Sequence, residues 1–311
     1  MTTVAFVVLL IGSTIRIATP IALAAIGATH AERSGVINVG IEGCMLFGAF
    51  GGVYGSYVTG SAGAGLLLGV ATGAAVSLIL AFFCIVLQAN QIVAGMAVNI
   101  LALGLTRFGL DQIWGKPGVS PQVDGLGSIE LPILSDIPLA GASIFTQNIV
   151  VLMLLPIALG SHLLLRRTAF GAHTTAVGEL PSAAASVGIS VWRTRFIAMA
   201  ICGALAGLAG VGLSLGQLTY FVEAMTAGRG FIALAANILG RWTPLGALLA
   251  ALLFGAADAL QLSLQVRGVD VPAQLLLVLP YLVTVVVLAA SSRRAKAPKA
   301  LGEPYDATVP T

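Results

Sequence analysis

Nine long apolar stretches constrain what this chain can fold into more than any other feature of its sequence. A helix of about 20 residues crosses the roughly 30 Å of hydrocarbon in a bilayer, and each stretch reaches or approaches that length. Helices also satisfy their own backbone hydrogen bonds in lipid. The sequence therefore predicts an all-α, polytopic membrane protein with about nine transmembrane helices, which run approximately over residues 3–29, 36–58, 63–89, 92–114, 147–166, 196–219, 222–240, 244–266 and 271–290.

The overall composition excludes a soluble fold. Hydrophobic residues make up 58% of the chain and charged residues only 9%, whereas soluble domains carry about 25% charged residues. A chain with so few polar groups cannot cover its apolar surface in water. Two stretches leave alternatives open. The first contains Arg16 and Pro20 and is either one kinked helix or two shorter ones, and the seventh is short around 231–240 and is either a full span or partly re-entrant.

Basic residues are distributed unequally over the predicted loops. With the N-terminus outside, ten of the 15 Lys and Arg residues fall on the cytoplasmic side, three fall outside and two lie within spans. Cytoplasmic loops of membrane proteins carry an excess of basic residues, so we expect the N-terminus outside and the C-terminus in the cytoplasm. The ten cytoplasmic residues are Arg33, Arg166, Arg167, Arg193, Arg195, Arg241, Arg293, Arg294, Lys296 and Lys299.

Residues 1–290 are predicted to form one transmembrane domain with two long loops on opposite sides. Residues 115–147 form an external loop that is rich in Gly and Pro and carries three acidic residues against one lysine. Residues 166–195 form a cytoplasmic loop, in which the Ala-rich run after Pro181 predicts a short helix. The cytoplasmic tail, residues 291–311, is basic, then rich in Pro and acidic residues, and is predicted to be disordered.

The sequence lacks the motifs of the common enzyme classes. It contains no GxxxxGK[ST] phosphate-binding loop. Residues 212–216 match the GxSxG pattern of serine hydrolases, but that nucleophile needs a preceding strand and a histidine partner, and the match falls in a Gly-rich span. The three cysteines show no metal-ligand spacing. We therefore expect a transport protein that is not an enzyme and binds no metal or cofactor, with pairs such as Gly203 and Gly207 letting its helices approach closely.

Polar side chains inside the apolar stretches are costly in a bilayer, so each one is a functional candidate. Arg107 and Asp111 lie four residues apart on one helix face and are predicted to form a structural ion pair. Any other single polar group is explained by a hydrogen bond between helices, but several on different spans indicate a shared polar pathway. Five candidates for a solute pathway follow from this pattern, namely Asn38, Glu42, Asn99, Asn237 and Asp258.

The candidate pathway residues also indicate the kind of solute. Amide and carboxylate side chains match the donors and acceptors of a neutral, hydrogen-bonding solute. Unpaired basic charge is scarce at these depths, which argues against an anionic solute.

Three runs of sequence carry a resemblance to a known family. They cover residues 19–52, 88–109 and 214–261, beginning TPIALAAIGATHAERSG, QANQIVAGMAVNI and SLGQLTYFVEAMTAGRG. The chain resembles the inner-membrane permease subunits of bacterial ABC importers for nucleosides and simple sugars, and it looks most like the shorter permease of nucleoside systems. The resemblance extends over roughly residues 15–290.

This resemblance implies partners that the chain itself does not contain. It implies a second permease, either a paralogue or an identical copy, and a cytoplasmic ATPase that binds ATP and Mg²⁺. It also implies an extracytoplasmic substrate-binding protein and a location in the bacterial inner membrane. Nucleic acid is not an expected partner.

The segment 176–189, AVGELPSAAASVGI, resembles the cytoplasmic coupling loop of that family, where the ATPase docks. Gly178, Glu179, Pro181 and Gly188 stand at the family's recurrent positions. The leading hypothesis is a permease for a nucleoside or nucleobase, and the alternative within the family is a pentose or another simple sugar. The alternative of a different class is a secondary transporter driven by ion gradients, which has no use for a coupling loop.

Overall fold

Six helices in the described part of the chain are long and apolar enough to cross a membrane. The computed structural model describes residues 3–130, 145–266, 278, 282 and 296–305. The ninth predicted stretch, 271–290, lies almost entirely outside these residues. The six helices are α1 (Thr3–Arg33), α3 (Ala62–Ala81) with the π-helical extension Phe82–Val86, α4 (Gln91–Trp114), α5 (Ile149–Arg167), α8 (Val191–Leu213) with the π-helical extension Ser214–Leu218, and α10 (Pro244–Val266). The chain is therefore a multi-pass membrane protein.

The first apolar stretch forms one continuous helix, which decides between the two alternatives left open above. Pro20 lies inside α1 and has no N–H to donate to the carbonyl of Arg16, four residues earlier. The side chain of Gln217 donates a hydrogen bond to this carbonyl over 3.3 Å. The helix is thus able to run through the proline because a neighbouring element replaces the missing donor.

Two further helices begin inside the bundle, later in the chain than the predicted spans. Helix α2 (Ile41–Thr59) starts five residues later than predicted, after a non-helical connection from α1. Helix α9 (Arg229–Leu239) has 11 residues, which cover about 16 Å at 1.5 Å per residue. That length is about half of the hydrocarbon thickness. The seventh stretch is therefore a half-length helix preceded by turns, which excludes the alternative of a full span over 222–240.

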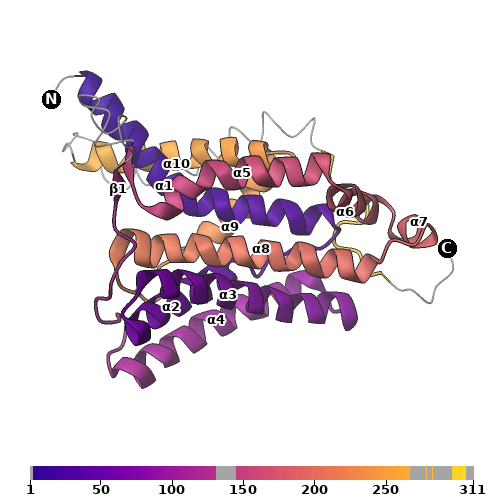
Figure 1. The fold of residues 1–311 in the computed structure, drawn as a ribbon, viewed down its shortest axis with the longest axis horizontal. Coiled ribbons are helices and arrows are strands. Elements are labelled where there is room, and N and C mark those ends of the chain that lie inside the picture. Colours follow the sequence, from indigo (N-terminus) through magenta and orange to yellow (C-terminus); the bar gives the residue numbers. More distant parts are fainter. Residues whose placement is uncertain (1–2, 131–144, 267–277, 279–281, 283–295, 306–311) are drawn as a thin grey trace.

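The bundle has two distinct ends, which lie left and right in Figure 1. The β1 end carries the antiparallel pair of β1 (Ile129–Glu130) and β2 (Thr146–Gln147). The α6 end carries α6 (Ala169–Glu179) and α7 (Pro181–Ser186). Helix α7 starts at Pro181 as predicted, because proline suits the first position of a helix. Apart from the two short strands, the described fold is helical, as predicted.

Glycines allow α2, α3 and α8 to touch through their backbones. A Cβ atom built on Gly73 of α3 would lie 2.5 Å from the Cα atom of Gly207 and 2.6 Å from the carbonyl oxygen of Gly203, both on α8. A Cβ atom on Gly48 of α2 would also collide with Gly207. Small residues permit this close approach of membrane helices. We call the contact of these four glycines the glycine seam.

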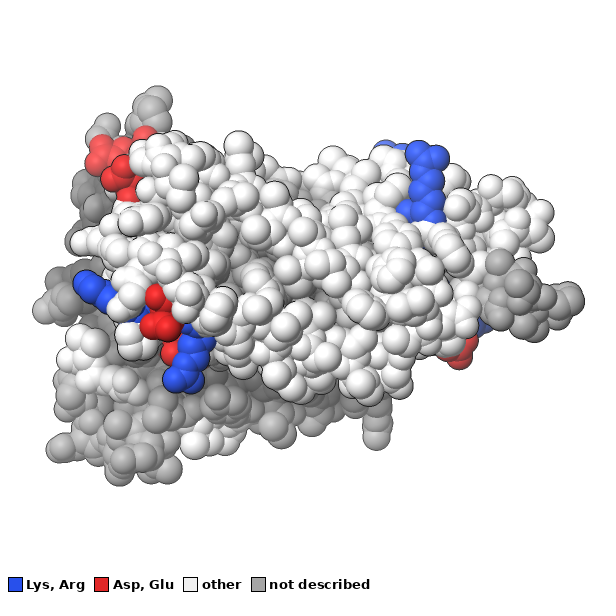
Figure 2. Space-filling view, turned by 90° about the horizontal axis from the view of Figure 1, so that it is seen from below, with Lys and Arg blue, Asp and Glu red and all other residues white. Residues whose placement is uncertain are grey.

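Charged side chains gather toward the two ends of the visible surface, and a broad uncharged belt lies between them, as Figure 2 shows. Part of the C-terminal tail contributes to the α6 end. The backbone N–H of Ala300 donates to the carbonyl of Gly178 over 2.9 Å, and that of Gly302 donates to the carbonyl of Gly35 over 3.0 Å. Residues 296–305 of the tail, for which the sequence predicts disorder, thus form backbone hydrogen bonds with the bundle.

Candidate functional site

The N-termini of α2 and α9 meet inside the bundle at Glu42. One carboxyl oxygen of Glu42 accepts a hydrogen bond from the N–H of Gly228 over 2.7 Å, and the other accepts from the N–H of Gly230 over 2.6 Å. Both groups belong to the start of α9, where N–H donors lack partners within the helix. A carboxylate also offsets the partial positive charge of a helix N-terminus. We call this contact of two helix starts the Glu42 junction.

The connection that leads into the Glu42 junction is held by amide side chains. Asn99 of α4 donates to the carbonyl of Val39 over 2.9 Å and accepts from the N–H of Gly43 over 2.8 Å. Asn38 donates to the hydroxyl of Ser77 over 3.2 Å and approaches the sulfur of Cys202 at 3.3 Å. The start of α2 is thus fixed to α3, α4 and α8 by side-chain hydrogen bonds.

The structure brings three of the five predicted pathway residues together and separates the other two. Asn38, Glu42 and Asn99 converge at the Glu42 junction. Asn237 lies near the opposite end of α9, where its side-chain oxygen accepts from the hydroxyl of Thr29 over 2.7 Å. Asp258 is partly buried on α10. The three asparagines are buried and bonded between helices, so a contact with solute stays a prediction for them.

A buried acidic residue at the end of α1 was missed by the sequence analysis. Glu32 is 3% exposed and accepts a hydrogen bond from the indole N–H of Trp242 over 2.5 Å. Trp242 follows α9 and has a positive φ of 51°, which is rare for a bulky residue. A charged residue beside Arg33 at a helix end is typical of a solvated loop, so only the packing of α9 against α1 reveals its burial.

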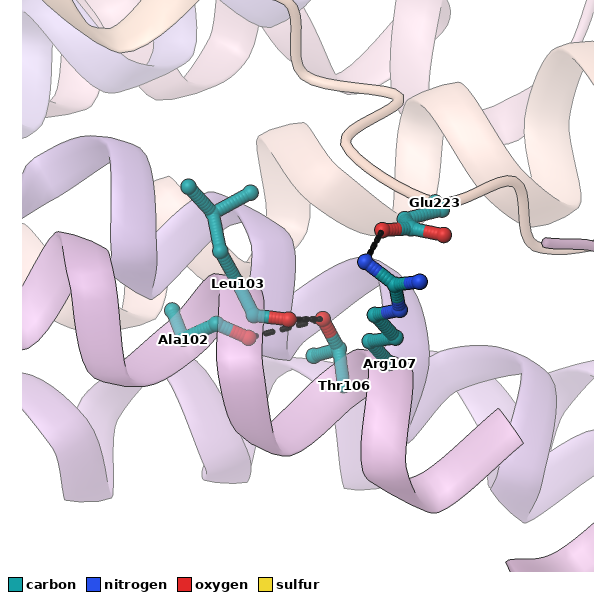
Figure 3. A network of polar contacts seen from close by, with 5 residues as sticks. All are labelled: Ala102, Leu103, Thr106, Arg107 and Glu223. Carbon is teal, nitrogen blue, oxygen red and sulfur yellow. Dashed lines mark hydrogen bonds and ion pairs between the residues drawn. The ribbon is translucent and has the colours of Figure 1, made fainter. Parts of the chain in front are cut away.

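The predicted ion pair between Arg107 and Asp111 is replaced by a different one. Arg107 contacts Glu223 at 3.5 Å between its terminal nitrogen and the carboxyl oxygen, as Figure 3 shows. It is the one ion pair in the part of the chain that the structure describes. The predicted pairing of Arg107 with Asp111 was wrong. The turn after α8 places Glu223 beside α4, whereas the spacing along α4 says nothing about that neighbour. The Arg107 side chain is 69% exposed, so the pair contributes little to stability.

The four residues predicted to couple to an ATPase lie on α6, on α7 and in the turn that follows. Glu179 is exposed at the end of α6, and Pro181 begins α7. Gly188 has a φ of 85°, a conformation that favours glycine. Gly178 has no such conformation. It is required because a Cβ atom there would collide with the carbonyl of Arg33.

Apolar side chains are exposed beside these four residues. Leu180 is 56% exposed and Val187 74% exposed, although both lie outside the candidate membrane spans. A neighbouring hollow of about 510 Å³ is lined by Phe170, His173, Val187, Ile189, Arg193 and Ile197, among others. Exposed apolar groups next to a hollow are typical of a surface that receives another protein.

A second hollow, of about 540 Å³, opens at the β1 end. Its walls come from the end of α2, the segment 122–125 and Thr219 after α8. Ser56 donates to the carbonyl of Asp124 over 2.8 Å, and Gln122 donates to the hydroxyl of Thr219 over 3.1 Å. The polar lining suits a hydrogen-bonding molecule that approaches from this end.

Comparisons with known proteins agree with this architecture. Residues 10–288 match the family described as branched-chain amino acid transport system / permease component. The chain is 39% identical to the guanosine ABC transporter permease protein NupQ of Bacillus subtilis over 96% of both chains. It is 36% identical to the nucleoside ABC transporter permease protein NupC of Lactococcus lactis, over 92% of this chain and 93% of that protein.

Two more similarities concern a sugar permease and a solved structure. The chain is 35% identical to a putative glucose ABC transporter permease protein of Haloferax volcanii, over 96% of this chain and 97% of that protein. A putative metal-chelate type ABC transporter in an inward-facing conformation matches 90% of this chain and 85% of its own with a TM-score of 0.52. At 16% sequence identity, this last match supports the fold alone.

Proposed function

The chain belongs to the branched-chain amino acid transport system / permease component family, and we propose from this premise that it forms the translocation pathway of an importer for a nucleoside or nucleobase. Membership in a permease family confirms the predictions of a transport subunit and of a chain that is not itself an enzyme. The exposed segment of α6 and α7 is the observation that carries the ATP-driven part of the proposal, because a transporter driven by ion gradients has no use for it.

The proposed solute class rests on relatives that span nearly the whole chain. Two of them are a guanosine and a nucleoside permease. A neutral nucleoside offers hydroxyl and ring groups that can bond to amide and main-chain groups. The second candidate solute is a simple sugar, because the putative glucose permease is 35% identical over a similar length. Both solutes are uncharged and bind through hydrogen bonds.

The Glu42 junction supplies polar groups where a continuous helix would present only apolar side chains. Two helices begin there, so main-chain groups and Glu42 lie inside the bundle, as is typical of the broken helices of transporters. In this proposal the solute enters from the β1 end, passes the junction and leaves at the α6 end. The residues of the junction need to bind it only weakly, because tight binding would retain it.

The proposed assembly adds partners at both ends. The α6 end faces the cytoplasm of a bacterium, where the apolar residues Leu180 and Val187 and the carboxylate of Glu179 contact the ATPase. That ATPase holds ATP and Mg²⁺, and this chain binds neither. The β1 end faces outward and receives the substrate-binding protein, and a second permease, paralogous or identical, completes the pathway in the inner membrane.

The function is tested by uptake into vesicles that contain the complete transporter. Vesicles loaded with ATP are expected to accumulate labelled guanosine, and unlabelled guanosine is expected to compete better than glucose or ribose. Better competition by the sugars would favour the second candidate solute, a simple sugar. Uptake that follows an ion gradient and ignores ATP would overturn the proposal.

The orientation and the coupling surface have tests of their own. Reporter fusions after residue 305 are expected to read as cytoplasmic, and fusions at 127 as external, with the reverse result contradicting the orientation. Glu179→Lys is expected to reduce recovery of the ATPase with the complex several-fold, whereas Glu130→Lys at the opposite end is the matched control. Equal recovery with both variants would remove Glu179 from the coupling surface.

A further inference from the structure

The C-terminal tail lies where the coupling surface meets the connection between α1 and α2. Ala300 is 4% exposed, and its N–H donates to Gly178 at the end of α6 over 2.9 Å. Two residues later, the N–H of Gly302 donates to Gly35, just after α1, over 3.0 Å. The tail thus bonds through its backbone to the coupling segment on one side and to the α1–α2 connection on the other.

A buried arginine also joins the tail to the α1–α2 connection. Arg195 of α8 is 1% exposed. It donates to the carbonyl of Ser34 over 3.1 Å and to the carbonyl of Glu303 over 3.2 Å. A hydrogen bond from a charged donor is stronger than one between neutral groups. Arg195 was predicted only to lie on the cytoplasmic side, and the structure places it under the tail.

Tyr305 of the tail contacts the coupling segment and the connection that leads into α4. Tyr305 packs against a small apolar cluster of Val177, Ala184 and Val191, which belong to α6, α7 and α8. The side chain of Gln88 donates to the carbonyl of Tyr305 over 3.3 Å. Any movement of α6 or α7 therefore changes the contacts of the tail.

The α1–α2 connection leads from the tail to the Glu42 junction. Gly35 lies three residues before Asn38 and seven before Glu42. A chain of seven residues reaches at most about 25 Å when extended, and it is fixed on the way by the side chain of Gln91, which accepts from the N–H of Ile37 over 2.7 Å. A short, bonded segment transmits a displacement more directly than a flexible one.

We propose that residues 296–305 form a strap that transmits movement of the coupling segment to the Glu42 junction. The inference rests on the proposed function and adds a positioning element to it. Movement of α6 pulls on Ala300, the strap displaces Gly35 and Ser34, and the connection carries this displacement to the start of α2. The strap contacts no solute and acts only through the segments that it joins.

The experiment compares shortened chains within the complete transporter. A stop after residue 295 removes the strap, and a stop after residue 305 keeps it and serves as the matched control. We expect the membrane abundance of the shorter chain, and the amount of ATPase recovered with it, to stay within twofold of the control. Its stimulation of ATP hydrolysis by solute-loaded binding protein is expected to fall at least fivefold, together with uptake. Wild-type stimulation after removal of the strap would overturn the proposal.

Point variants separate transmission from simple support of the fold. Gly302→Val introduces a side chain where φ is 83° and where a Cβ atom would lie 3.2 Å from Ile37, so it is expected to displace the strap and to lower stimulation. Lys299→Ala, at an exposed neighbour, is expected to behave as wild type. Loss of abundance in both the shortened chain and Gly302→Val would make the tail a fold-stabilising segment and overturn the strap.

Two further outcomes keep this proposal distinct from the function on which it rests. Loss of ATPase recovery after removal of the strap would make the tail a docking surface and would overturn transmission. If the wild-type complex shows no stimulation by guanosine-loaded binding protein and no ATP-dependent uptake, the proposed function fails. If the wild type is stimulated and the shortened chain is stimulated equally, the strap fails and the proposed function stands.

Discussion

The glycine seam and the Glu42 junction hold helices together in opposite ways. At the seam, α2, α3 and α8 touch through backbone atoms, with no side chain between them. At the junction, α2 and α9 are joined by two hydrogen bonds to one carboxyl group. Backbone contacts of glycines have one arrangement, whereas side-chain hydrogen bonds can be exchanged for bonds to a solute. We therefore propose that the seam is the scaffold and that the junction is the changeable part of the proposed pathway.

The largest expected effect follows from filling the seam. Gly73→Leu places a side chain where even a Cβ atom lies 2.5 Å from Gly207, and overpacking of this kind typically costs about 1–3 kcal/mol or more. We expect the protein to disappear from the membrane fraction, as measured by immunoblot. Gly160→Leu on the exposed side of α5, where nothing lies within 4 Å, is the control. Normal abundance of Gly73→Leu would show that the seam is not the scaffold.

A smaller effect on abundance and a large effect on transport are expected at Glu42. Glu42→Leu leaves the N–H groups of Gly228 and Gly230 without their acceptor, and a donor left unpaired at a buried residue such as Gly230 costs about 1–3 kcal/mol. Uptake of labelled guanosine is expected to fall about tenfold or more while the protein remains in the membrane. Glu42→Gln keeps one acceptor oxygen, so its uptake is expected to lie between that of the wild type and that of Glu42→Leu. If Glu42→Leu lost its abundance as Gly73→Leu does, the junction would be scaffold as well.

Asn99→Leu tests whether a bonded amide also serves the pathway. The change keeps the approximate volume of the side chain and removes the bonds to Val39 and Gly43. A lost hydrogen bond of about 1 kcal/mol corresponds to a several-fold effect, so uptake is expected to fall several-fold with abundance and basal ATP hydrolysis retained. Collapse of abundance with normal uptake per molecule would identify Asn99 as a packing residue only.

The smallest effect is expected at the ion pair of Arg107 and Glu223. Both side chains are at least one-third exposed, and exposed pairs contribute about 0.2–1 kcal/mol. Arg107→Ala, Glu223→Ala and the double variant are expected to retain abundance and uptake within twofold. The thermal midpoint of the purified complex gives the coupling between the two substitutions. A coupling above about 2 kcal/mol would place this pair with the scaffold, contrary to the comparison.

Some helix bounds and residue contacts could be predicted from the sequence, and others could not. Helix α10 spans the predicted 244–266, and α4 starts one residue before its predicted boundary, because length and hydropathy suffice to define a helix in lipid. The start of α7 at Pro181 was also predictable. The half-length of α9 was only one of two alternatives that the sequence left open, since its apolar stretch continues into turns. Arg107 was assigned to its neighbour along α4, but its partner comes from a turn more than 100 residues away.

Three properties of this chain could be predicted from its amino-acid order alone: that it is a helical membrane protein, where most of its helices lie and which segment resembles a coupling loop. These properties depend on apolar runs, on charge and on motifs, all of which are local along the chain. Three other features are visible only in the folded chain: Glu42 joins two helix starts, Arg195 is buried, and residues 296–305 lie against Gly178 and Gly35. Each of these depends on which donors and acceptors become neighbours in space, and hydrogen bonds between segments far apart in sequence leave no local pattern.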